Sequence, residues 1–321
     1  MNFRKSLAIV VFPCFFFSIT NAQATKDGFK VIPLGVKGGL DESNLSAYLV
    51  AANGSNNFIS LDAGTINAGL QKALAQKSLE ASSAEEAQKK FIKGYFISHG
   101  HLDHLAGLIL NAPNDVNKPI YAFPSVIEVL KNNYFTWKSW ANFANEGDKP
   151  ILNKYQYQNL VAGKEIDIPN TELHLTPFSL SHVNPYESSA FLVRNNNDYL
   201  LYLGDTGADT VEKSTKLAEL WTAVAPMVTN GKLKAIFIEV SFDNSMPDKA
   251  LFGHLTPKLL MQELSKLNAI AAGSLKHTNI VVTHIKPCDN CAQTIQKQIE
   301  AENTIGLPIV YPIQGKLMVL K

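Results

Sequence analysis

Four potential metal ligands lie within six consecutive residues, in the run His99-Gly-His-Leu-Asp-His104. The run follows an apolar segment typical of a strand and precedes a helical pattern, so its polar side chains are expected on the connecting loop, where α/β folds place their sites. Burying three imidazoles and a carboxylate together without a cation would leave a large desolvation cost uncompensated. The spacing therefore predicts a metal site, with His99 and His101 facing one side of the loop and Asp103 and His104 facing a neighbouring position.

Three further candidate ligands, His182, Asp205 and His284, each end or follow an apolar run. Together with the loop they complete two coordination shells, which predicts two divalent metal ions. Every proposed ligand is a nitrogen or oxygen donor, a set that suits zinc and also admits iron or manganese.

The elements that must position these ligands alternate between short apolar strands and helices. Strands are expected at Phe29–Val36, Ser46–Ala51, Phe58–Leu61, Gly94–Ser98, Ile120–Phe123, Glu172–Thr176, Ser189–Val193, Tyr199–Leu203, Ala235–Val240, Asn279–Thr283 and Lys316–Leu320. Helices are expected at Ile66–Lys77, Ala84–Lys93, Ser125–Asn132, Thr210–Leu220, Pro257–Leu267 and Ala292–Ala301. This order, in two successive halves, predicts an α/β fold of two sheets packed face to face with helices outside.

The first 24 residues differ in composition from the rest. Arg4 and Lys5 precede an apolar stretch from Leu7 to Phe17, and Ala22-Gln-Ala24 follows. This pattern predicts a secretory signal peptide over 1–24, and a mature chain that begins near Thr25 and forms one hydrolase domain over 25–321. The mature protein is expected to be periplasmic or secreted, with no membrane-spanning helix.

The net charge of +1 argues against a nucleic-acid polymer as partner and favours a small-molecule substrate. Beyond residue 24 the cysteines are Cys288 and Cys291. No second pair completes a zinc cluster with them, so either a local disulfide or two free thiols is expected.

The ligand pattern resembles that of the metallo-β-lactamase superfamily over nearly the whole mature chain. The resemblance implies a four-layer αββα sandwich with a two-metal site at one edge. More narrowly, His99-Gly-His-Leu-Asp-His-Leu-Ala-Gly-Leu-Ile-Leu110, Gly253-His-Leu-Thr-Pro257 and Thr283-His-Ile-Lys-Pro287 resemble the class II 3′,5′-cyclic nucleotide phosphodiesterases. One residue departs from that pattern, because Ala112 stands before Pro113 where a serine is usual.

The resemblance also implies a role for each candidate ligand. Three histidines would hold the first metal ion: His99, His101 and His182. Three residues would hold the second: Asp103, His104 and His284. Asp205 would bridge the two ions, and Asp62 would lie just outside them and orient a histidine or a water.

The implied reaction is hydrolysis of cAMP, cGMP or both to 5′-nucleotides by a metal-bridging hydroxide. His254, at the start of a helix, is the candidate general acid for the leaving 3′-oxygen, and Glu239 would orient it. Asp103 counts as both ligand and catalytic residue. A similar Glu and His pair occurs in tRNA 3′-processing endonucleases, whereas a purely structural His254 is the alternative. His174 and His277 are expected to be surface or packing residues.

Three other functions remain open. Another hydrolase of the same fold, such as a lactonase, thioesterase or arylsulfatase, would differ at the leaving-group end, where Glu239 and His254 favour phosphodiester cleavage. A tRNA endonuclease fits these two residues but not the signal peptide or the near-neutral charge. A non-catalytic binding protein on a degenerate fold would have lost a ligand, and no ligand is lost.

An aromatic cluster lies in an expected insertion from Asn114 to about Lys154: Tyr134, Phe135, Trp137, Trp140 and Phe143. Two interpretations stay open. The cluster is either satellite core or a cap on which the flat base of a nucleotide stacks.

Overall fold

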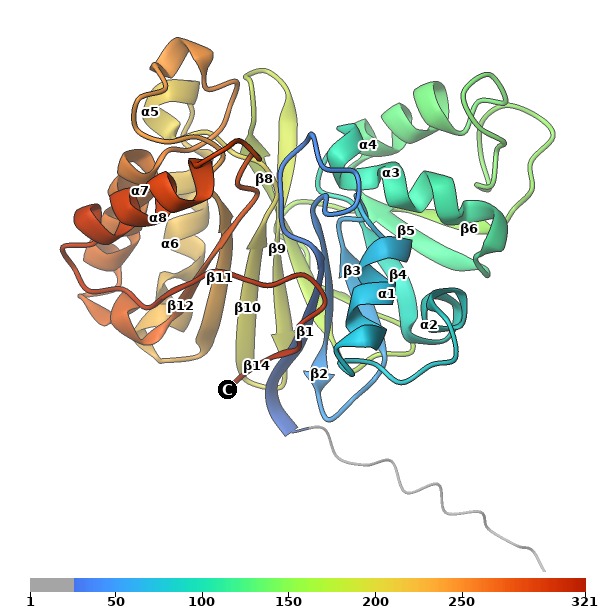
Figure 1. The fold of residues 1–321 in the computed structure, drawn as a ribbon, viewed down its shortest axis with the longest axis horizontal. Coiled ribbons are helices and arrows are strands. Elements are labelled where there is room, and N and C mark those ends of the chain that lie inside the picture. The colour runs from blue at the N-terminus through green and yellow to red at the C-terminus, as the bar shows by residue number, and fades with distance from the viewer. Residues whose placement is uncertain (1–25) are drawn as a thin grey trace, which may run out of the picture.

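The computed structural model describes residues 26–321, and the predicted signal peptide lies outside this range. Two seven-stranded sheets pack face to face, and helices cover both outer faces (Figure 1). The predicted αββα sandwich is therefore confirmed.

The N-terminal half of the chain builds the first sheet, together with the last strand. Its order is β14-β1-β2-β3-β4-β5-β6. The strands are β1 (Lys26–Gly35), β2 (Ala47–Asn53), β3 (Phe58–Leu61), β4 (Ile92–Phe96), β5 (Lys118–Ala122), β6 (Tyr155–Asn159) and β14 (Met318–Leu320). The helices of this half are α1 (Asn67–Ala75), α2 (Ala84–Phe91), α3 (Leu102–Asn111), η1 (Ala112–Asn114), α4 (Pro124–Val129) and η2 (Leu130–Tyr134).

The second sheet has the order β13-β12-β11-β10-β9-β8-β7. Its strands are β7 (Ile166–Asp167), β8 (His174–Ser181), β9 (Glu187–Asn195), β10 (Asp198–Leu203), β11 (Leu233–Glu239), β12 (Asn279–Thr283) and β13 (Ile309–Val310). The helices of this half are α5 (Asp209–Glu212), α6 (Lys216–Thr229), η3 (Asp248–Ala250), α7 (Pro257–Ile270), η4 (Ser274–His277) and α8 (Cys291–Glu302).

An aromatic core joins the two sheets. Tyr48 of β2 lies with its ring centroid 5.6 Å from that of Tyr202 on β10 and 5.4 Å from that of Phe237 on β11, and all three are buried. Two further apolar cores lie between each sheet and its own helices. Because aromatic side chains bury large areas, this central layer fixes how the strand ends of one sheet stand opposite those of the other.

The predicted helix Thr210–Leu220 is wrong. The chain forms α5, breaks at Lys213, which has a left-handed φ of 53°, and begins α6 at Lys216. The Asp209 carboxylate accepts hydrogen bonds from the N–H groups of Leu217 (3.1 Å) and Ala218 (2.9 Å), in the first turn of α6. This longer-range cap satisfies amides that a continuous helix would have bonded internally.

The sequence prediction also missed three strands and shortened a fourth. β7 and β13 are two residues long, which is too short for a period to show. β6 begins directly after the segment taken as an insertion. β8 continues through Pro177 to Ser181. β7 pairs only with His174 and Leu175, so beyond them no strand requires an N–H from β8 on that side, and proline is tolerated at position 177.

The aromatic cluster is mostly core. Phe135 is buried, and Tyr134, Trp140 and Phe143 pack against the core of the first sheet. Trp137 is 44% exposed and donates its Nε1–H to the Pro150 carbonyl at 2.8 Å. The structure thus favours the satellite-core interpretation over a stacking cap.

Cys288 and Cys291 form a disulfide.

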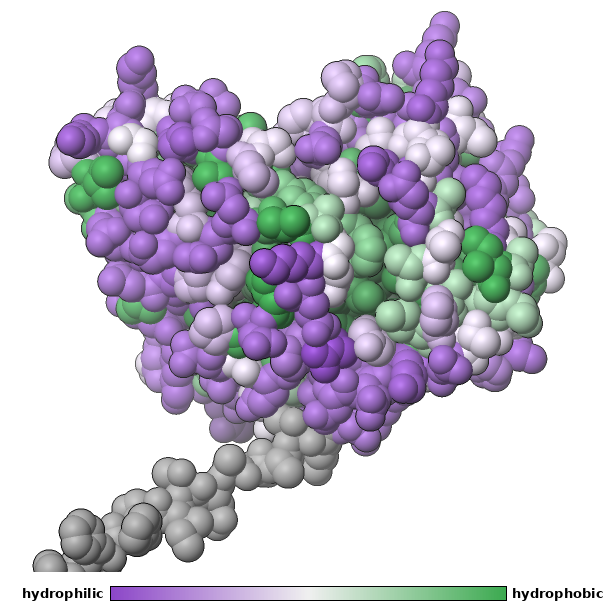
Figure 2. Space-filling view, turned by 180° about the vertical axis from the view of Figure 1, so that it is seen from behind, coloured by the Kyte–Doolittle hydropathy of each residue, from purple (hydrophilic) through white to green (hydrophobic). Residues whose placement is uncertain are grey.

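Hydrophilic side chains cover most of the face shown in Figure 2, and hydrophobic ones gather near its middle. Within residues 26–321, none of the helices combines the length and the apolar character that crossing a bilayer requires.

Candidate metal centre

The seven predicted ligands converge at one edge of the sandwich, although they come from both sheets. The loop after β4 and the first turn of α3 supply His99, His101, Asp103 and His104. The turns that follow β8, β10 and β12 supply the other three: His182, Asp205 and His284. Strand ends that run in the same direction meet at one edge, which explains why residues so far apart in sequence gather here.

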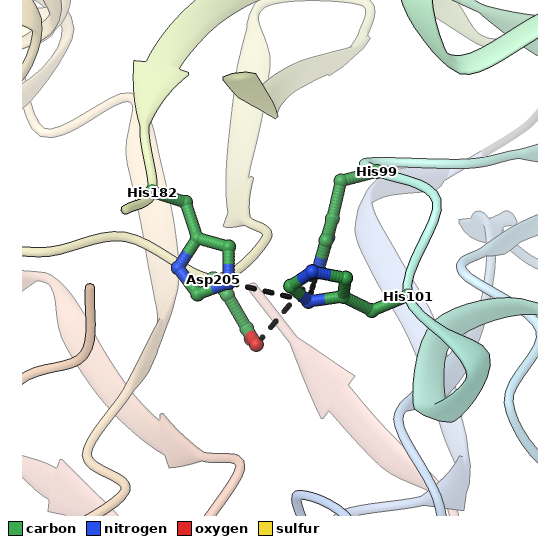
Figure 3. A group of neighbouring side chains, drawn as sticks. All are labelled: His99, His101, His182 and Asp205. Atoms are coloured by element: carbon green, nitrogen blue, oxygen red, sulfur yellow. Dashed lines mark hydrogen bonds and ion pairs between the residues drawn. The ribbon is translucent and has the colours of Figure 1, made fainter. Parts of the chain in front are cut away.

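The first group consists of His99, His101, His182 and Asp205, whose potential ligand atoms lie within 4.8 Å of one another. Figure 3 shows their imidazoles and the carboxylate turned toward one another. His101 Nδ1 lies 3.0 Å from His99 Nε2 and 3.3 Å from His182 Nε2. His99 Nε2 lies 3.8 Å from the Asp205 carboxylate.

The second group consists of Asp103, His104, Asp205 and His284, again within 4.8 Å. His284 Nε2 lies 3.1 Å from Asp103 Oδ2 and 3.2 Å from Asp205 Oδ2, and His104 Nε2 lies 3.2 Å from Asp205 Oδ1. Asp205 belongs to both groups, as a bridging ligand must. The two groups match the two ligand sets that the family resemblance implies.

Asp62 lies outside both groups and orients site residues that come from the N-terminal half of the chain. It is fully buried at the end of β3, and its carboxylate accepts hydrogen bonds from the Ser98 N–H (2.7 Å), the Ser98 hydroxyl (2.8 Å) and the Tyr202 hydroxyl (2.6 Å). It also accepts from His104 Nδ1 at 2.7 Å. The His104 ring is thereby held with Nε2 toward the centre, which agrees with the orienting role expected for Asp62.

Glu239, at the end of β11, orients site residues that come from the C-terminal half of the chain in the same way. Its Oε1 lies 2.7 Å from His254 Nδ1, and its Oε2 accepts the Ser241 hydroxyl at 2.8 Å. Ser241 Oγ in turn lies 2.9 Å from His284 Nδ1. One buried carboxylate therefore orients His254 directly and His284 through a serine.

The expected site residues His254 and Glu239 thus lie against the metal groups. The His254 ring centroid is 5.0 Å from that of His182 and 5.3 Å from that of His284. The two remaining histidines lie elsewhere. His174 bonds Asp167 through Nδ1 at 2.5 Å, and His277 is an exposed residue of η4.

Other contacts that hold the ligands were missed from the sequence. His182 Nδ1 lies 2.8 Å from the Gly253 carbonyl oxygen, to which it donates. The exposed ligand of the first group, His101, stacks on Tyr186 at a centroid distance of 5.1 Å and an interplanar angle of 7°. The Tyr186 hydroxyl accepts the Gly100 N–H at 3.1 Å. The position of Tyr186, a few residues after His182, was the available signal, but its stacking partner depends on the folded turn.

Close backbone approach fixes the start of α3. A Cβ atom on Gly64 would lie 2.0 Å from the Asp103 carbonyl oxygen, so no other residue fits there without a shift of the backbone.

Two residues of the site have a strained backbone: Asp62 and His284 adopt left-handed φ values of 53° and 58°. Such strain is kept where the surrounding contacts determine the backbone, as they do here.

Burial and charge prepare the centre for a cation. Burial lowers the pKa of His99 well below its usual value and that of His101 to about 4, which keeps both imidazoles neutral. Burial also acts to lower the pKa of His104, but the carboxylates of Asp205 and Asp62 outweigh it and raise this pKa. The carboxylates therefore favour a positive charge between them, and the neutral imidazoles can use their free nitrogen lone pairs to bind a cation there.

The donor set fits divalent metal ions. The ring nitrogens that face away from the centre already have hydrogen-bond partners. His104, His182 and His284 use Nδ1 for Asp62, Gly253 and Ser241, respectively, and turn Nε2 inward. Nitrogen and carboxylate ligands with oriented outer nitrogens are typical of zinc and related metal centres. The His and Asp clusters of this fold are thus able to bind divalent metals.

Comparison with known proteins agrees with this geometry. The family model of the class-II cAMP phosphodiesterases matches residues 24–315. A 3′,5′-cyclic-nucleotide phosphodiesterase of Aliivibrio fischeri is 40% identical over 98% of this chain and 98% of its own length. Unliganded yeast PDE1 has a TM-score of 0.79 at 23% identity, covering 92% of this chain and 99% of that one. YhfI from Bacillus subtilis, a metallo-β-lactamase fold protein, has a TM-score of 0.61 at 16% identity, covering 92% of this chain and 100% of that one. The expected metallo-β-lactamase fold is therefore confirmed.

We expect Asp62→Asn to weaken metal binding by about 10- to 100-fold, because the outer carboxylate that orients His104 and favours positive charge there is lost. Titration with a competing chelator, followed by elemental analysis, measures the change. Asp115→Asn is the matched control, since Asp115 is also a buried carboxylate but binds Tyr95, Tyr155 and Lys118. Equal losses in the two variants would contradict the role of Asp62.

Proposed function

Because the chain belongs to the class-II cAMP phosphodiesterase family, we propose that it hydrolyses 3′,5′-cyclic nucleotides to 5′-nucleotides at the cluster of histidines and aspartates. The observation that carries the proposal is the contact of the buried His254 and Glu239 pair with both metal groups. Hydrolysis of a cyclic phosphodiester releases a 3′-alkoxide that needs a proton at this place.

We further propose that two divalent cations occupy the two groups, zinc being favoured by the donor set and iron or manganese remaining alternatives. When bound, such a pair supplies a hydroxide at neutral pH and offsets the charge that develops on the phosphate oxygens. Asp205, shared by the groups, would be a ligand to both ions. The chain itself supplies the orientation, through Asp62 for His104 and through Glu239 and Ser241 for His284.

His254 is suited to give the proton. Burial acts to lower its pKa, but the neighbouring Glu239 outweighs burial and the pKa is raised above its usual value. Nδ1 is bonded to Glu239 at 2.7 Å, which leaves Nε2 for the transfer. In the step, water loses a proton to solvent as its oxygen bonds to phosphorus, the bond from phosphorus to the 3′-oxygen breaks, and His254 protonates that oxygen and then regains a proton from solvent. The near-neutral net charge of +1 supports a small substrate rather than an RNA.

We also propose that the enzyme acts in the periplasm or outside the cell. The basic, apolar and small-residue pattern over residues 1–24 supports export, and the Cys288–Cys291 disulfide suits an oxidising compartment.

Chelation is expected to abolish turnover of cAMP by the purified protein, and zinc, iron or manganese is expected to restore it. Elemental analysis of the active protein should find two ions per chain. A protein loaded with two ions that hydrolyses neither cAMP nor cGMP would refute the proposed function, and a lactone or sulfate ester would then be tested.

For His254→Ala we expect kcat on cAMP to fall about 10²- to 10⁴-fold, the usual contribution of a general acid. The defect should shrink on bis(p-nitrophenyl) phosphate, whose leaving group needs no proton. Bound metal is measured in the same samples and should stay unchanged. His174→Ala, which removes a histidine bonded to Asp167 on the surface, is the control and should keep full activity. An equal defect on both substrates would refute the role of His254 as proton donor.

Expression of the full chain in a bacterium tests export. Activity is expected in the periplasmic or medium fraction, with a mature N-terminus near Thr25. Activity confined to the cytoplasm, on a chain that still begins at Met1, would contradict the proposal.

A further inference from the structure

Two turns that carry site residues lie against each other beside the metal centre. The turn after β8 carries His182 and Val183, and the segment before α7 carries Phe252, Gly253 and His254. Gly253 accepts the hydrogen bond from His182 through its carbonyl, and a Cβ atom on Gly253 would lie 2.3 Å from the Val183 nitrogen. Val183 and Phe252 are therefore neighbours of a candidate metal ligand and of the candidate proton donor.

Both residues expose an apolar side chain on a strained backbone. Phe252 is 67% exposed at a φ of 49°, and Val183 is 44% exposed at a φ of 53°. For a bulky or β-branched residue a left-handed φ is unfavourable, and strain of this kind concentrates at ligand-binding sites. Exposing these two side chains contributes little to the stability of the fold, whereas a ligand placed on them would cover them.

These residues form the apolar wall of a cavity of about 490 Å³. Asn184, Glu212, Lys213, Asp248 and Lys249 provide polar or charged groups at the same cavity. In Figure 1 the segment before α7, drawn in orange, arches over α5 at the top of the C-terminal half. Polar and charged residues thus make up most of the lining, the apolar part consists of Val183, Val211 and Phe252, and the volume suits a small molecule that carries polar groups.

We propose that this cavity binds the nucleobase of the cyclic nucleotide, with the Phe252 ring stacked on the base and Val183 beside the sugar. This inference rests on the proposed function. Segment Phe252–His254 then places three groups in consecutive residues: a surface for the base, a carbonyl that orients His182, and the proton donor for the 3′-oxygen. Binding of the base would thus add affinity for the whole nucleotide, equally in the bound substrate and in the transition state, so its loss is expected in KM and not in kcat.

The test compares Phe252→Ala with the unaltered chain on cAMP and on ribose 3′,5′-cyclic phosphate, which lacks the base. Loss of one base stack predicts a KM for cAMP raised roughly 5- to 150-fold, with kcat and the KM for the abasic substrate unchanged. Phe252→Trp should restore the KM for cAMP.

Leu40→Ala is the matched control. Leu40 is 81% exposed with a φ of 58°, and it follows Gly39, whose N–H donates to Asp103 at 3.0 Å, so it is also an exposed, strained residue one position from a site contact. The control should keep the KM of the unaltered chain. An unchanged KM in Phe252→Ala, or an equal rise on both substrates or in both variants, would overturn the base site alone. Absence of cAMP turnover by the unaltered, metal-loaded chain would refute the proposed function and the base site with it.

Discussion

The carboxylate of Asp205, buried between imidazoles of the two sheets, is the contact on which the rest of the structure depends. It lies 3.2 Å from Nε2 of His104, which belongs to the first half, and 3.2 Å from Nε2 of His284, which belongs to the second. Burying this charge is favourable only if those imidazoles, or cations that they hold, stay within reach. The two sheets must therefore keep a fixed position relative to each other at this edge, and the aromatic layer around Tyr48 and Phe237 supplies that rigidity.

Each half of the chain also carries a buried carboxylate at a strand end that orients histidines of the site. Asp62 and Glu239 both lie outside the two groups of ligands, and each fixes the outer nitrogen of a histidine. Asp62 accepts four hydrogen bonds and Glu239 reaches His284 through Ser241. The rotamers of the histidines are thus set before any cation binds, which reduces the ordering cost of binding.

The convergence of the candidate ligands could be predicted from the sequence because each ends or follows an apolar strand, and strand ends of one direction meet at one edge. The orienting contacts could not be predicted in the same way. Tyr186 stacks on His101 only because the turn after β8 folds back. Ser241 bonds both Glu239, two residues before it, and His284, 43 positions later in the chain. The break between α5 and α6 was not predicted for a similar reason, because Asp209 caps a helix that starts seven residues later. Local periodicity contains none of these longer-range contacts.

The site also divides its tasks between two kinds of backbone. The ligands and their carboxylates lie at the ends of strands held by the cores, whereas the apolar cavity wall lies on turns with left-handed residues. Gly253 connects the two parts and is constrained twice, by its φ of 71° and by the 2.3 Å that would separate an added Cβ from the Val183 nitrogen. Phe252 also has a left-handed φ, of 49°, but its residue is 67% exposed, so packing holds little of its side chain. Substitution at position 252 can therefore alter what the cavity accepts without moving His182, whereas substitution at position 253 would displace a candidate metal ligand as well.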